Sequence, residues 1–257
     1  MIEKPSFKNF KITEMIRIFR DLDSLNHFAA ERFIEIGTEA FEERGKFTVA
    51  LAGGSTPKSL YQLLTTDKFC SQINWRKVFF FFGDERNVLP GNAESNFQMA
   101  CENLLKPLQI SENQIFRWQT EIEDAERVAE DYEEKIKVFF DLTENEFPRF
   151  DLILLGTGDD GHTASLFPMT KALGETRKIA VANWVQKLKT NRFTFTFTTI
   201  NNASNIMFLI VGSAKAEVLR EILEGDVQPE RFPAQNVKLK SGNLLWLLDE
   251  KAAQNLK

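Results

Sequence analysis

Cysteine is nearly absent from this 257-residue chain, and long apolar runs are missing altogether. The two cysteines, Cys70 and Cys101, lack the spacing of a zinc site, so we expect neither a disulfide framework nor a structural metal. No stretch approaches the roughly 20 apolar residues of a membrane span, and the N-terminal segment lacks the apolar centre of a signal peptide. These absences favour a cytoplasmic protein that does not associate with a membrane.

The chain also has no excess of positive charge. Its 32 lysines and arginines are outnumbered by 37 aspartates and glutamates, which gives a net charge of -5. A negative long-range field disfavours nonspecific binding to nucleic acid or to anionic lipid. Nucleic acid is therefore not an expected partner, and any anionic ligand needs a local cationic site.

Phenylalanine, in contrast, is abundant, with 24 residues. The run VFFFF at 78–82 favours β structure and ends at Gly83, which indicates a central strand rather than an aromatic binding surface. With 43% hydrophobic residues, the chain can bury on the order of 70% of its unfolded surface. We expect one α/β domain over residues 1–257, as a monomer rather than an obligate oligomer.

Strand and helix patterns alternate along the chain without a recognisable linker. Such alternation favours a mostly parallel sheet flanked by helices. Strands are predicted at 15–19, 47–51, 78–82, 152–155, 181–185, 192–200, 205–212 and 243–249. Helices are predicted from Asp23 or Ser24 towards Glu43, from near Pro57, and over about 97–105, 124–142 and 214–223.

The most informative segment is DLILLGTGDDGHTASLFP, from Asp151 to Pro168. Its aliphatic run predicts a buried parallel strand, and the glycines that follow allow a tight turn at the strand's carboxyl end, where open α/β sheets bind ligands. In that turn Asp160 precedes His162, and a carboxylate can orient an imidazole as a general base requires. The other histidine, His27, lies within a predicted helix, where a surface or partly packed role is expected.

Two other chemistries fit this turn less well. Thr163 and Ser165 offer hydroxyl groups, but the GxSxG motif of a serine nucleophile is absent. One carboxylate and one histidine are also too few ligands for a metal site unless distant carboxylates complete it.

Three further loops follow predicted strands. Gly54, Ser55 and Thr56, in AGGSTP, join a glycine turn to a helix start and suit a phosphate, although a capped turn explains them as well. Neither this loop nor GTGDDG has the pattern of a Walker A or dinucleotide-binding motif.

The other two loops contribute cations. In GDER, Arg86 suits a phosphate or carboxylate, and Asp84 can orient a sugar hydroxyl or that arginine; a structural ion pair is the alternative. Lys215, at a helix start in VGSAKA, opposes the helix dipole, so it either faces an anion or points into water.

Taken together, these segments resemble the family of 6-phosphogluconolactonases and glucosamine-6-phosphate deaminases. The resemblance runs in the family's order from about Met15 to Ala253. It is carried by LAGGSTP, FFGDERNV followed by ESN, LLGTGDDGHTASLFP, RFTFTFTTIN, VGSAKAEVL, FPAQNV and LLWLLD. It implies a Rossmann-like parallel sheet and hydrolysis of 6-phospho-D-glucono-1,5-lactone to 6-phosphogluconate, in the oxidative pentose phosphate pathway.

The resemblance also implies roles for individual residues. His162 would activate water, and Asp160 would position or polarise that histidine. The phosphate would lie near Gly54, Ser55 and Thr56, a set to which Arg86, Arg192 and Lys215 would add positive charge. The substrate would be a small sugar-phosphate lactone, and the scheme requires no cofactor and no metal.

Two departures from the family's patterns bear on the activity. Deaminases of this family carry a glutamate after the DGH motif, but Phe167 stands at that position here, which favours the lactonase. Lactonases commonly have prolines before the arginine strand, whereas this chain reads VQKLKTNRFTF, so the loop from Gln186 to Asn191 is expected to differ in shape. A deaminase-like isomerase and a noncatalytic sugar-phosphate sensor remain the alternatives. A sensor of this kind would normally carry a DNA-binding helix-turn-helix, for which the segment before Met15 is too short.

Overall fold

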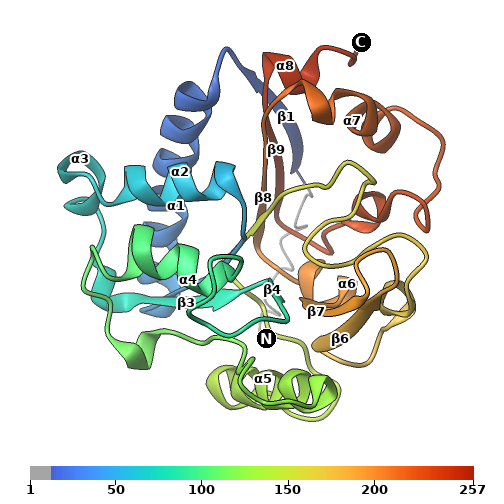
Figure 1. Ribbon diagram of the computed structural model, residues 1–257. Helices are drawn as coiled ribbons and strands as arrows, with labels where there is room; N and C mark the ends of the chain where they lie inside the picture. The colour runs from blue at the N-terminus through green and yellow to red at the C-terminus, as the bar shows by residue number, and fades with distance from the viewer. Residues whose placement is uncertain (1–12) are drawn as a thin grey trace, which may run out of the picture.

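The computed structural model describes residues 13–257, whose strands form two sheets (Figure 1). The larger sheet has six strands in the order β1-β9-β8-β5-β2-β3, and every neighbouring pair is parallel. These strands are β1 (Thr13–Phe19), β2 (Phe47–Leu51), β3 (Val78–Phe82), β5 (Leu152–Leu155), β8 (Asn205–Ile210) and β9 (Asn243–Asp249). The prediction of a mostly parallel sheet is confirmed.

Three interior strands are buried along their whole length because both faces of the sheet are covered. Every residue of β2, β5 and β8 is buried. Their sequences FTVAL, LILL and NIMFLI are runs of apolar residues rather than alternating patterns, as a doubly covered parallel strand requires.

A smaller antiparallel sheet has the strand order β4-β7-β6 and comprises β4 (Asp84–Arg86), β7 (Thr190–Phe195) and β6 (Ala180–Val185). Gly83 joins the two sheets. Its amide donates to the Leu51 carbonyl of the large sheet, and its carbonyl accepts from the amide of Phe195 in the small one. The small sheet is thereby fixed at the carboxyl ends of β2 and β3.

Helices flank both sheets (Figure 1). They are α1 (Leu22–Arg44), α2 (Ser55–Leu64), α3 (Asp67–Cys70), α4 (Asn96–Ala100), α5 (Ala125–Phe140), α6 (Phe197–Ile200), α7 (Ala216–Leu223) and α8 (Glu250–Ala253). α1 packs on α2 and on the large sheet, and α5 packs on β6 and β7. Among residues 13–257, no helix combines the length and apolar character needed to cross a bilayer.

Several predicted boundaries shift for local reasons. α1 begins at Leu22 because Asp21, rather than Asp23 or Ser24, caps it, with its carboxylate accepting from the Ser24 amide at 2.9 Å. The strand predicted at 192–200 ends at Phe195, because Thr196 caps the short helix α6. The GDER segment forms strand β4 rather than a loop.

The helix predicted over about 97–105 exists, but it changes type within its length. α4 continues into a π-helical turn over Cys101–Leu105. The predicted helix at 214–223 is also divided, because a 3₁₀ turn over Ser213–Lys215 precedes α7.

The strands β2 and β5 are neighbours in the sheet, and the chain leaves them in opposite directions: from β2 to β3 on one side, and from β5 to β8 on the other. From β2 the chain proceeds outwards to β3, then returns to β5 on the opposite side of β2. This arrangement is a topological switch point, and open α/β sheets bind ligands in the crevice that it creates.

Candidate active site

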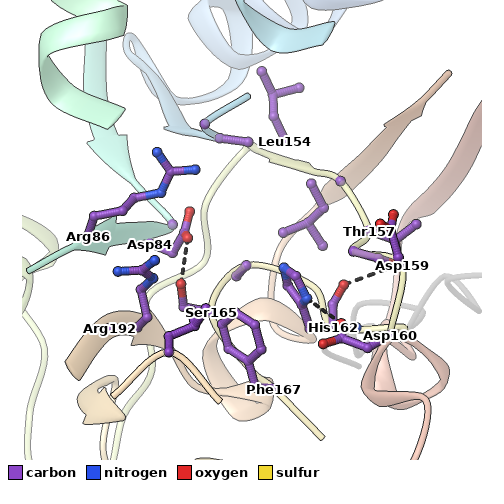
Figure 2. A pocket seen from close by; sticks show the side chains of 18 of the residues that line it. Asp84, Arg86, Leu154, Thr157, Asp159, Asp160, His162, Ser165, Phe167 and Arg192 are labelled. Carbon is purple, nitrogen blue, oxygen red and sulfur yellow. Dashed lines mark hydrogen bonds and ion pairs between the residues drawn. The ribbon is translucent and has the colours of Figure 1, made fainter. Parts of the chain in front are cut away.

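A cavity of about 410 Å³ occupies the carboxyl end of the large sheet, at this switch point. Ala52 and Gly53 line it after β2, residues 154–160 line it from β5 onwards, and β4 and β7 contribute Arg86 and Arg192. Figure 2 shows these arginines on one side of the cavity and His162 with Asp160 on the other. The cavity thus joins segments from both halves of the chain.

His162 and Asp160 are in direct contact. The Nδ1 atom of the imidazole lies 2.5 Å from Asp160 Oδ1, and the same oxygen accepts from the His162 amide at 3.3 Å. The glycine turn closes behind them, because the Gly158 amide donates to the His162 carbonyl at 2.9 Å. The backbone therefore sets the geometry of this carboxylate–imidazole pair.

Hydrogen bonding keeps Asp160 ionised. The hydrogen bond from His162 is the largest cause that lowers the pKa of this carboxyl far below its ordinary value, and a contact with Lys187 adds to it. An ionised carboxylate can only accept, so His162 Nδ1 carries the proton. In the neutral imidazole, Nε2 then has a free lone pair, and Figure 2 shows that this nitrogen points away from Asp160.

Two neighbours restrict the imidazole. Phe167 stacks on it, with ring centroids 4.0 Å apart and the planes tilted by 25°. On another side the ring approaches Gly158, where a Cβ atom would lie 2.0 Å from His162 Cε1. Only glycine leaves room for this ring position.

Arg86 and Arg192 form a cationic pair. They are register partners in the antiparallel pairing of β4 with β7. Arg86 Nη1 donates to the Glu94 carbonyl at 2.5 Å, and neither arginine has an ion-pair partner within residues 13–257. Burial, followed by the charge of Arg86, lowers the pKa of Arg192 from its usual value, yet a guanidinium stays protonated near neutrality. Two adjacent cations that form no salt bridge within the described part of the chain suit an anionic ligand.

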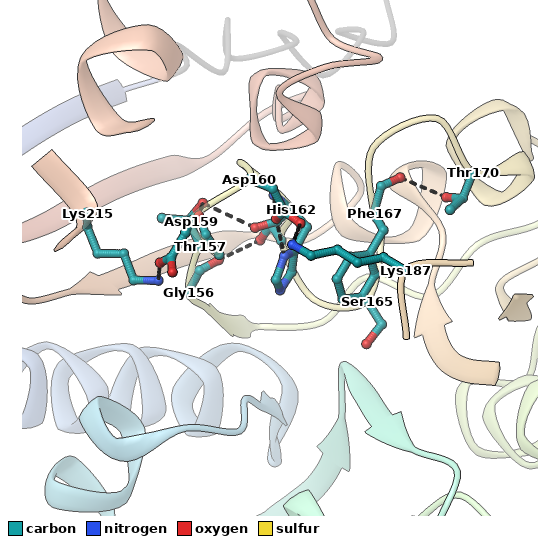
Figure 3. Close-up of polar contacts among 12 residues, drawn as sticks. Gly156, Thr157, Asp159, Asp160, His162, Ser165, Phe167, Thr170, Lys187 and Lys215 are labelled. Atoms are coloured by element: carbon teal, nitrogen blue, oxygen red, sulfur yellow. Dashed lines mark hydrogen bonds and ion pairs between the residues drawn. The ribbon is translucent and has the colours of Figure 1, made fainter. Parts of the chain in front are cut away.

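Lys215 also lines the cavity, but it has a partner. Its ammonium group forms an ion pair with Asp159, the first carboxylate of the turn (Figure 3). Asp159 is 75% exposed on its side chain, whereas Lys215 is 26% exposed. The sequence left open an anion partner or solvent for this lysine, and the structure provides an anion from the protein itself.

Asp84 belongs to a buried polar network rather than to an ion pair with Arg86. Ser165 Oγ donates to Asp84 Oδ2 at 2.7 Å, and Asn96 Nδ2 donates to Oδ1 at 3.1 Å.

The hydroxyl of Thr163 donates to the Gly156 carbonyl at 2.9 Å. The hydroxyl groups of Thr163 and Ser165 are thus engaged in structural hydrogen bonds, consistent with the absence of a serine-nucleophile motif.

The glycine loop reaches the cavity through Gly53. The three predicted residues Gly54, Ser55 and Thr56 follow it, but they do not line the cavity walls. Gly54 has φ of 108° and is the N-cap of α2, without a side-chain capping bond. Ser55 and Thr56 form the first turn of α2, where backbone amides lack intrahelical acceptors.

The sequence interpretation missed Lys187, which lines the cavity and contacts Asp160 Oδ2 at 3.2 Å. The only sequence signal was its place in the 186–191 loop, which departs from the family's proline pattern. Within residues 13–257, no three His, Cys, Asp or Glu side chains gather in a metal-binding arrangement.

Comparisons with known proteins place the chain in a family. Residues 20–246 match the family described as glucosamine-6-phosphate isomerases/6-phosphogluconolactonase. A Synechocystis 6-phosphogluconolactonase is 43% identical over 222 residues, covering 86% of this chain and 89% of the relative. One from Chlamydia pneumoniae is 34% identical over 245 residues, covering 93% and 90%. The solved structure of the Trypanosoma brucei 6-phosphogluconolactonase has a TM-score of 0.83 at 31% identity, covering 97% of this chain and all of that one. The chain therefore belongs to the glucosamine-6-phosphate isomerase/6-phosphogluconolactonase family.

Proposed function

We propose that this protein hydrolyses 6-phospho-D-glucono-1,5-lactone to 6-phospho-D-gluconate, with His162 as the general base. The observation that carries the mechanism is the 2.5 Å contact of Asp160 with His162 Nδ1, in the same cavity as Arg86 and Arg192. One end of the cavity thus offers a base, and the other offers unpaired positive charge. The base serves the ester group of a phosphorylated lactone, and the positive charge serves its phosphate.

The lactone end follows from the tautomer of His162. Nε2 removes a proton from water, and the water oxygen attacks the carbonyl carbon to give a tetrahedral intermediate. As the bond from that carbon to the ring oxygen breaks, the imidazolium returns the proton to the ring oxygen. The product is a single open-chain hydroxy acid, whose new carboxyl group ionises in water. Asp160 stabilises the transient imidazolium throughout.

The phosphate end uses the cations. Arg86 and Arg192 bind phosphate oxygens, and Lys215 exchanges Asp159 for the substrate's anion. Gly54 opens the first turn of α2, where the amides of Ser55 and Thr56 add neutral donors at the positive end of the helix dipole. The carboxylate of Asp84, held by Ser165 and Asn96, accepts a hydrogen bond from a hydroxyl group of the sugar.

The proposal also covers the compartment, the domain organisation, the oligomeric state and the partner. We propose that the enzyme acts in the cytoplasm, as one α/β domain over residues 1–257 and as a monomer. Its partner is the small sugar-phosphate lactone, and its acidity disfavours nucleic acid.

The test is hydrolysis of freshly generated 6-phosphogluconolactone, measured above the spontaneous rate. We expect His162→Ala to lower kcat/KM by about 10²-fold to 10⁴-fold, the usual contribution of a general base. His27→Ala is the matched control, because His27 is exposed on α1 and remote in sequence from the cavity residues. Near-normal turnover by a folded His162→Ala variant would show that another group is the base.

Phe167 favours hydrolysis over the family's deaminase reaction. It presents an apolar ring to His162, at the position where the deaminase pattern has a glutamate. Ring opening and isomerisation of an amino sugar need that additional acid–base group. We therefore expect no ammonia release from glucosamine 6-phosphate at enzyme concentrations that hydrolyse the lactone. Release at a comparable rate would favour the deaminase instead.

A further inference from the structure

The hairpin between β6 and β7 extends the small sheet to the catalytic turn. Its strands pair in register from Ala180 with Phe195 to Val185 with Thr190. Lys187 and Leu188, at its tip, line the same cavity as His162. This tip is the segment whose sequence departs from the proline-containing pattern, and the proposed reaction has given it no role so far.

Lys187 completes the contacts of Asp160. Oδ1 of Asp160 holds the imidazole, and Oδ2 accepts from Lys187 Nζ at 3.2 Å (Figure 3). Each carboxylate oxygen thus has a separate cationic or hydrogen-bonding partner. A carboxylate with both oxygens engaged resists rotation, and this fixes the direction in which it presents Oδ1 to His162.

Lys187 also adds a positive charge beside the imidazole. The cation opposes protonation of His162, whereas the Asp160 carboxylate favours it. Lys187 is 71% exposed, so water screens this effect and its size is modest. An exposed lysine still acts on the acid limb of a pH profile, because that limb reports the proton affinity of the base.

We propose that Lys187 is a positioning residue of the active site: from the β6–β7 hairpin it fixes the Asp160 carboxylate and places a positive charge beside the carboxylate–imidazole pair. This inference rests on the proposed roles of Asp160 and His162. The hairpin tip then supports the base His162 through Asp160, and it does not recognise the substrate's phosphate.

Other charged groups also line the cavity around the pair. The turn itself contributes Asp159, which is paired with Lys215 from the turn before α7. The small sheet contributes Arg192, which lines the same cavity. These groups are unchanged when Lys187 is replaced, so a shift in the profile is attributable to that lysine.

The experiment compares the pH dependence of kcat/KM for wild type, Lys187→Met, Lys187→Arg and Lys189→Met. Loss of the cation makes the imidazolium easier to form, so the acid-limb midpoint of Lys187→Met moves to higher pH, by about half a unit at low ionic strength. We also expect kcat at the plateau to fall, because the Asp160 carboxylate loses the contact that engages Oδ2. Lys187→Arg restores the midpoint because it keeps the charge.

Lys189→Met is the matched control, since it removes the same charge from an exposed position of the same hairpin that does not line the cavity. An unmoved midpoint in Lys187→Met, or an equal shift in Lys189→Met, overturns the inference. A KM increase confined to the phosphorylated lactone, with an unmoved midpoint, assigns Lys187 to phosphate binding and also overturns it. Failure of the proposed function is distinct: wild type would then lack an acid limb that depends on His162.

Discussion

At the residue scale, the reactive geometry depends on side chains that are absent as much as on those present. Gly158 leaves space for the imidazole of His162, and Phe167 covers that ring with an apolar face. Asp160 fixes the tautomer by accepting from Nδ1. The imidazole is therefore held by a carboxylate on one side and an aromatic ring on another, and it fits only because Gly158 has no Cβ.

Gly158→Ala tests the missing Cβ. The new methyl would lie 2.0 Å from His162 Cε1, so the ring must rotate away and lose its alignment with Asp160. Because the displaced atoms belong to a side chain, we expect the free energy of unfolding to change by only about 1 kcal/mol, while kcat/KM falls at least about 10²-fold. Urea unfolding and lactone hydrolysis measure the two effects. Full activity in the variant would mean that the ring tolerates this displacement.

At the element scale, the short strand β4 explains how two arginines far apart in sequence become neighbours. Pairing of β4 with β7 sets Arg86 opposite Arg192. Glu85, which precedes Arg86 and is the register partner of Phe193, is buried and accepts from the amides of Asn96 and Phe97 at 2.7 and 2.8 Å. Burial raises the pKa of Glu85, and these amides act in the opposite direction. This anchor fixes β4 to the start of α4.

The arginine pair predicts coupled effects on binding. We expect Arg86→Ala and Arg192→Ala each to raise KM for 6-phosphogluconolactone about 10-fold or more, and to affect unphosphorylated gluconolactone much less. The double variant should lose less than the product of the single effects, because both groups bind one anion. Arg76→Ala, at an exposed site, is the control. Equal effects on both lactones would remove these residues from the phosphate site.

At the scale of the whole molecule, the phenylalanines connect the sheet to the helix that supports the small sheet. Phe81 stacks on Phe116 with centroids 4.6 Å apart and contacts Phe139, Phe140 and Phe150 at 5.2, 5.9 and 5.0 Å. The abundance of phenylalanine is therefore architectural in this region, as the VFFFF pattern predicted.

Phe81→Ala should destabilise the protein by about 3–5 kcal/mol, since it leaves a cavity in this aromatic cluster. Phe81→Leu, which retains most of the volume, should cost less than half as much. Urea unfolding measures both, and KM below the transition should stay near the wild-type value. A loss under about 1 kcal/mol in the alanine variant would mean that the cluster collapses to fill the space.

The parallel sheet was predictable because its signal is local and strong. An aliphatic run as short as 152–155, followed by Gly156, is typical of a strand buried on both faces. Asp160 and His162 were also predictable as candidate residues of one glycine turn. Their direct contact was not, because two side chains of a turn can point in different directions. The capping residue of α1 and the strand β4 were missed, since single hydrogen bonds and three-residue pairings leave little trace in composition.

The sequence alone determined the fold class, the family resemblance and the choice of Asp160 and His162 as candidate residues, because hydrophobic periodicity and local motifs encode them. Only the tertiary structure set Arg86 opposite Arg192, bound Ser165 to Asp84, paired Lys215 with Asp159 and brought Lys187 to Asp160. These contacts join residues from different elements, and their distances depend on strand register and hairpin position. A charge pattern shows that a lysine is present, but the fold decides which carboxylate it meets.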